Sequence, residues 1–122
     1  MNKHQLSVLL KDLRSLSAET EWVEFKANNA QELGQYLSAL SNSACIHDES
    51  YGYLVFGISD KTHQIVGTSF DPNQKAKGNE DLIPWLSRLL NPRVHFDYFT
   101  LKQDDKRVVI FRVKATLRSC LN

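Results

Sequence analysis

Basic side chains are concentrated near the end of this 122-residue chain, and their chemistry suits contact with the phosphate groups of a nucleic acid. Beyond residue 98, the only acidic residues that oppose them are Asp104 and Asp105. Basic hairpins can lie along a nucleic-acid groove, whereas charges that protect an edge strand from aggregation are the competing interpretation. The candidate phosphate contacts are Lys102, Lys106, Arg107, Arg112, Lys114 and Arg118.

A glycine followed by a Lys-Thr pair gives a weak indication of nucleotide binding. Gly57 precedes Lys61 and Thr62, but the phosphate-binding loop G-x-x-x-x-G-K-[ST] requires a second glycine that this segment lacks. The segment also follows an apolar, strand-like run and leads into a turn rather than a helix. The pattern therefore argues against nucleotide hydrolysis.

Acidic residues around an alternating segment are the other candidates for chemistry. Glu24 and Lys26 stand two positions apart, so a strand would place both side chains on one face, where Lys26 could meet a phosphate or form a surface ion pair. Glu19 could converge with Glu24 only if it precedes the strand or if a bulge re-aims it. Asp60 occurs where aspartate commonly shapes a turn. Taken alone, these residues leave ordinary structural roles open.

Length and composition fit one globular domain. The chain is 42% hydrophobic and 24% charged, and no apolar stretch approaches the length of a membrane span. Its N-terminus lacks the pattern of a signal peptide, so we expect a cytoplasmic protein with reduced thiols at Cys45 and Cys120. Residues 1–60 have four Lys/Arg against eight Asp/Glu, while residues 61–122 have eleven against six. The basic half leaves room for a local phosphate-binding patch.

Hydrophobic periodicity predicts the elements that must position these residues. Helical spacing predicts helices over residues 3–16 and 82–90. It also predicts a further helix whose apolar face carries Leu33, Leu37, Leu40 and Ala44. Asn29 and Glu32 resemble a capping box at the start of that helix. Strands are predicted over residues 21–26, 51–58, 64–67, 94–101 and 107–113, the last two joined by a four-to-five-residue connection.

These elements predict an α+β fold in which three helices pack on a mixed, mainly antiparallel sheet with a C-terminal hairpin. The run at residues 51–58 is apolar almost throughout, as expected for a central strand buried on both faces. We expect a single domain over residues 1–122.

Four segments in this order resemble the Schlafen AlbA-like family. The first is Glu19-x-x-x-x-Glu24-Phe25-Lys26, and the second is the helical segment LSALSNS at residues 37–43. The third is GYLVFGISD at residues 52–60, followed by Ile65-Val66-Gly67. The fourth is a helix that ends in Asn91-Pro92, before a hairpin that closes on VIFRV at residues 109–113.

The resemblance implies a DNA- or RNA-binding domain of a transcription regulator or a helicase-related protein, without catalysis or a cofactor. In Schlafen ribonucleases similar to this family, the positions of Glu19, Glu24 and Asp60 form a metal-binding catalytic cluster. The alternative function is therefore an endoribonuclease that uses Mg²⁺ or Mn²⁺, with Lys26 near the scissile phosphate. A protein-interaction or oligomerisation module, for example a homodimer, is a third hypothesis. Since the family commonly continues into larger domains, we also expect this chain to be a fragment.

Overall fold

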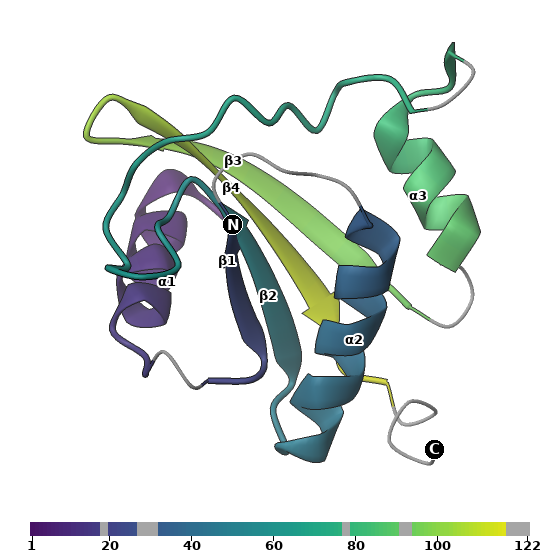
Figure 1. Cartoon of the computed structure of the whole chain (residues 1–122), viewed down its shortest axis with the longest axis horizontal. Helices are drawn as coiled ribbons and strands as arrows, with labels where there is room; N and C mark the ends of the chain where they lie inside the picture. The colour runs from purple at the N-terminus through teal and green to yellow at the C-terminus, as the bar shows by residue number, and fades with distance from the viewer. Residues whose placement is uncertain (18–19, 27–31, 77–78, 91–93, 117–122) are drawn as a thin grey trace.

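A four-stranded mixed sheet separates one helix from two others (Figure 1). The computed structural model describes residues 1–17, 20–26, 32–76, 79–90 and 94–116. In these ranges the helices are α1 (Lys3–Arg14), α2 (Leu33–Ile46) and α3 (Leu82–Leu90). The strands are β1 (Val23–Lys26), β2 (Tyr51–Phe56), β3 (Phe96–Gln103) and β4 (Lys106–Lys114), in the spatial order β1-β2-β4-β3. The predicted α+β class is confirmed.

Strand pairing follows from the connections. β1 and β2 are parallel, because α2 carries the chain back between them, while β4 is antiparallel to both β2 and β3. β2 and β4 are therefore the two inner strands, and the prediction of a central strand at residues 51–58 is confirmed. None of the described helices is long and apolar enough to cross a membrane.

Each face of the sheet has its own hydrophobic core. On one face, leucines of α1 pack with Val55, Val108 and Ile110. On the other face, leucines of α2 and α3 pack with Phe56 and Phe111. The split follows from the alternation of side chains along a strand, since consecutive residues of β4 point to opposite faces.

α1 is positioned by its leucines and by a cap. Leu6, Leu10 and Leu13 are buried at helical spacing. The Gln5 backbone N–H donates to Asn2 Oδ1 at 2.8 Å, and the Asn2 backbone N–H donates to Gln5 Oε1 at 2.9 Å. This reciprocal pair satisfies two backbone donors at the start of the helix.

Three expectations about local structure are wrong. Glu32 is itself the N-cap of α2, without a side-chain cap, rather than the third residue after a cap, and Asn29 lies outside the described residues. Residues 64–67 form no strand, because Ile65 makes only an isolated bridge to Ile58. Cys45 is disulfide-bonded rather than a reduced thiol, since sequence separation says nothing about tertiary proximity; Cys120 lies outside the described residues.

The hairpin connection is shorter than predicted. β3 and β4 remain paired as far as Gln103 and Lys106, so only Asp104 and Asp105 form the turn. Both have positive φ, 54° and 61°. Two consecutive left-handed residues are typical of a type I′ turn, which matches the twist of the strands it joins and which aspartate tolerates.

Candidate nucleic-acid interface

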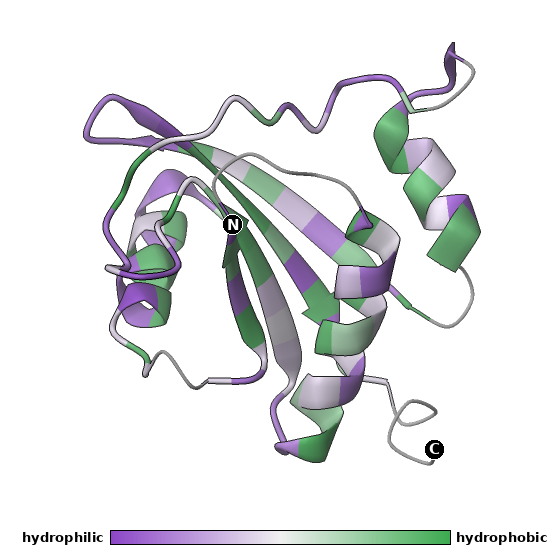
Figure 2. Ribbon diagram, in the orientation of Figure 1, coloured by the Kyte–Doolittle hydropathy of each residue, from purple (hydrophilic) through white to green (hydrophobic). Residues whose placement is uncertain are grey.

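The tip of the β3–β4 hairpin presents several of the predicted phosphate contacts. Lys102 is paired with Arg107 in the register of the two strands, and Gln103 is paired with Lys106. Lys102 and Lys106 are exposed, and Arg107 is partly exposed. Figure 2 shows that this end of the hairpin is hydrophilic, in contrast to the apolar positions in the middle of the sheet. The hairpin therefore holds these cations in solvent.

The basic residues at the tip differ in their partners from Lys75 and Arg88. Arg88 pairs with Glu80 and Lys75 with Asp81. In the part of the chain that the structure describes, no carboxylate pairs with Lys102, Lys106, Arg107 or Lys114. Among the described residues, Lys106 Nζ donates to the backbone carbonyl of Ile65, at 3.3 Å. The charges at the tip are therefore available to an external anion.

Arg112 is held by other groups of the domain. Its Nη2 donates to Asp97 Oδ2 at 3.0 Å, and its guanidinium lies 4.6 Å from the ring centroid of Tyr51 and 5.4 Å from that of Phe99. Its Nε is buried without a hydrogen-bond partner among the described residues. Arg112 therefore packs the sheet surface, and its position does not favour the predicted contact with phosphate.

The predicted basic residues do not form one patch. Lys106 and Lys114 stand at opposite ends of β4, and eight residues of extended strand span about 26 Å. Arg118 lies outside the described residues. The structure therefore brings Lys102, Lys106 and Arg107 to the hairpin tip, with Lys102 and Arg107 on one face of the hairpin and Lys106 on the other, and separates them from Lys114.

A second polar cluster lies at the carboxyl ends of the parallel strands β1 and β2. Lys26 Nζ is 3.9 Å from Glu24 Oε1 and donates to the Tyr36 hydroxyl of α2 at 2.7 Å. The pKa of Lys26 is raised, first by the hydrogen bond to Tyr36 and also by the negative charges of Glu24 and Asp60. Lys26 and Asp60 both line a pocket of about 380 Å³. The parallel pairing brings Lys26 and Asp60 to the same edge of the sheet.

The described residues do not form a metal site at this edge. Within the described ranges, no three His, Cys, Asp or Glu side chains are grouped so that they could hold a metal ion. Glu19, the third predicted ligand, lies outside the described residues. An ammonium group stands beside Glu24 and within electrostatic reach of Asp60, where it offsets their negative charge. Among the described residues, Glu24 and Asp60 are therefore the predicted ligands that remain at this edge, with the ammonium of Lys26 near them.

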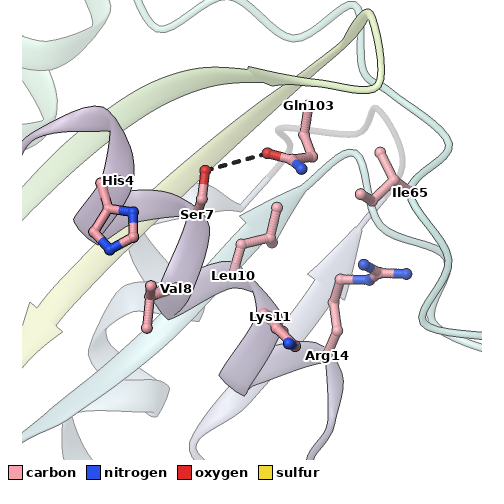
Figure 3. Close-up of a pocket in the computed structure, with 8 residues that line it drawn as sticks. All are labelled: His4, Ser7, Val8, Leu10, Lys11, Arg14, Ile65 and Gln103. Carbon is pink, nitrogen blue, oxygen red and sulfur yellow. Dashed lines mark hydrogen bonds between the residues drawn. The ribbon is translucent and has the colours of Figure 1, made fainter.

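A third site was missed by the sequence prediction. α1, the hairpin and the segment around Ile65 border an open pocket of about 330 Å³, shown in Figure 3. Lys11 and Arg14 of α1 line it together with Gln103 of β3. Lys11 and Arg14 are three residues apart, so both cations lie on one side of the helix, and this spacing was the signal that the sequence offered for the site. Only the packing of α1 on the sheet shows that this side meets the hairpin.

A family model described as Schlafen, AlbA_2 matches residues 19–120, most of the chain. The chain belongs to the Schlafen AlbA_2 family. The match includes all four strands, α2 and α3 of this Schlafen AlbA_2 domain, whereas α1 precedes it. No match to a curated protein sequence was found. Membership of the family favours a nucleic-acid-related role.

Proposed function

We propose that this Schlafen AlbA_2 domain binds nucleic acid through the tip of its β3–β4 hairpin and does not cleave it. In this proposal, the domain targets a larger transcription regulator or helicase-related protein to DNA. The observation that carries the proposal is the contrast among cations: Lys102, Lys106 and Arg107 lack carboxylate partners among the described residues, whereas Lys75 and Arg88 have them.

The physical basis is local rather than global electrostatics. The formal net charge of the chain is only +1, so the whole molecule attracts a polyanion weakly. The hairpin projects its cations from the end of the sheet, and each cation that meets a phosphate releases condensed counterions. Binding should therefore be salt-sensitive, with a slope that reflects a few phosphate contacts.

Fluorescence anisotropy with labelled duplex DNA and hairpin RNA, at several salt concentrations, tests this function. Lys106→Gln combined with Arg107→Gln should weaken binding and should reduce the salt slope by about two, since each phosphate contact contributes roughly one. The matched control is Lys75→Gln combined with Arg88→Gln, which removes the same residue types where carboxylates already pair with them. Equal losses in both double variants, or no binding by the unmodified domain, would refute the proposal.

Metal-dependent RNA cleavage is the second candidate, and the gathering of Glu24, Lys26 and Asp60 at one sheet edge favours it. The labelled strands from the titration should be run on a gel after incubation with and without Mn²⁺. Intact strands would support a binding domain. Cleavage that requires Mn²⁺ and disappears in Glu24→Gln would replace the proposal with the nuclease.

Sedimentation velocity on the same samples addresses the third hypothesis, a homodimer. A dimer whose formation is prevented by oligonucleotide would indicate that the hairpin is buried between subunits. A sedimentation coefficient that rises only by the mass of one bound oligonucleotide would support a binding domain.

A further inference from the structure

We propose that the pocket between α1 and the β3–β4 hairpin binds a backbone phosphate of the nucleic acid, and so extends the interface from the hairpin tip onto α1. This inference rests on the proposed function and assigns it a second contact site. The pocket was not among the sequence-predicted sites, and α1 lies outside the family match.

The lysine and arginine that line the pocket are not accompanied by a carboxylate among its described residues. Lys11 and Arg14 line it from α1, and neither an aspartate nor a glutamate is among its described lining residues. Asp12 is exposed on the same helix but does not line the pocket. An anion in the pocket therefore meets two positive charges at close range, with no carboxylate to repel it there.

Contacts with His63 hold Arg14 in position. Its Nε donates to the backbone carbonyl of His63 at 2.7 Å, and the ring Nδ1 of His63 is 3.1 Å from the backbone carbonyl of Arg14. Figure 3 shows the guanidinium directed along the pocket towards Ile65. Because Nε makes the anchoring bond, the two terminal nitrogens remain to face a ligand, and a guanidinium fork suits two oxygens of a phosphate.

A hydrogen bond also orients the side chain of Gln103. The hydroxyl of Ser7 donates to Gln103 Oε1 at 3.2 Å, the contact drawn as a dashed line in Figure 3. Since this bond occupies the acceptor end of the carboxamide, its NH₂ end is left to donate. An uncharged donor that is fixed in this way adds directionality to the attraction of the two cations.

The pocket is continuous with the hairpin tip. Ile65 lines the pocket, and its backbone carbonyl accepts the hydrogen bond from Lys106 Nζ. Gln103 lines the pocket and is paired with Lys106 in the hairpin. A polymer with regularly repeated phosphates can meet Lys106 at the tip and Lys11 on α1 in one passage. This continuity favours a nucleic-acid strand over a small isolated anion.

Two glutamine variants on one helix test the pocket. Lys11 and Lys3 are both exposed on α1, but only Lys11 lines the pocket. In the anisotropy titration with oligonucleotide, Lys11→Gln should lower the salt slope by about one and affinity by roughly five- to tenfold at 0.1 M salt. Lys3→Gln should stay within about twofold of the unmodified domain, since it loses the same charge without a fixed phosphate contact. In NMR spectra, the amide of Gln103 should shift on addition of the oligonucleotide and should shift less in Lys11→Gln.

The outcomes separate the two proposals. Suppose that Lys11→Gln and Lys3→Gln lose affinity equally while Lys106→Gln with Arg107→Gln still weakens binding. The proposal of a phosphate site in the pocket is then wrong, and the proposed function of the hairpin stands. If the unmodified domain binds no oligonucleotide, both fall. If polyglutamate binds as tightly as the oligonucleotide and with the same dependence on Lys11, the site recognises acidic polymers in general, and its assignment to phosphate is wrong.

Discussion

Lys26 of β1 donates a hydrogen bond to the hydroxyl of Tyr36 of α2 across 2.7 Å, and its ammonium lies 4.4 Å from the centroid of the same ring. The contact joins the first strand to the helix that follows it. It also holds Lys26 beside Glu24, so Tyr36 positions the positive charge at this edge of the sheet.

Tyr36→Phe should lower both stability and the pKa of Lys26. The hydrogen bond from Tyr36 is the largest cause that raises this pKa above the ordinary value of 10.5. Loss of one such bond should reduce the free energy of unfolding by about 1 kcal/mol. Urea unfolding at neutral pH and NMR titration of the Lys26 side chain measure the two effects. Tyr98→Phe, at a tyrosine with no hydroxyl hydrogen bond among those described, is the control and should change neither.

The pH dependence of this contact has a definite sign. A lysine whose pKa is raised by folding contributes stability that is fully present below its unfolded pKa and is lost as pH rises through the folded pKa. The contribution of Lys26 should therefore be constant at neutral pH and decline only above about 10.5. A decline between pH 6 and 8 that depends on Lys26 would contradict this assignment.

Gly52→Ala should destabilise the domain. A Cβ at Gly52 would lie 2.7 Å from the backbone oxygen of Leu40, so α2 would have to move away from β2. Overpacking of this kind costs roughly 1–3 kcal/mol. Thermal unfolding should show a lower midpoint. Gly34→Ala is a suitable comparison, because its nearest contact is the flexible side chain of Leu89 at 3.3 Å, and it should be close to neutral.

Arg112→Gln should reduce stability but should leave the salt slope of nucleic-acid binding unchanged. The guanidinium pairs with Asp97 and lies over two aromatic rings, contacts that together contribute on the order of 1 kcal/mol. Chemical unfolding and the anisotropy titration are the paired measurements. A fall in the salt slope as large as that of Lys106→Gln would show that Arg112 contacts phosphate after all.

Asp104→Asn combined with Asp105→Gly should stabilise the hairpin and strengthen binding. Both residues have positive φ, which Asn-Gly adopts with less strain, for a gain of about 1 kcal/mol. The change also removes two negative charges next to Lys106. The urea concentration at the midpoint of unfolding and the affinity for oligonucleotide should both rise. Asp104→Asn with Asp105→Asn separates the two causes, since it removes the charges but gains less from the backbone.

The sequence by itself determined the elements and the family. Apolar spacing located α1, α3 and the inner strand β2 to within a few residues, because burial of one helix face or of both strand faces leaves a periodic record in the chain. The family pattern was recognisable because its segments recur in order. The length of the hairpin turn was less predictable. Asp104 and Asp105 would suit a longer loop equally well, and their left-handed backbone conformation cannot be read from their residue type.

Only the tertiary structure decided which charges act together. Arg112 looked equivalent to Arg107 in the sequence, but strand register places it opposite Asp97, whereas Arg107 stands opposite Lys102. Lys11 and Arg14 belong to an acidic half of the chain, yet the packing of α1 on the sheet brings them to the hairpin. Coulomb interactions depend on distance in space, and that distance is determined by strand order and helix packing, which local patterns do not encode.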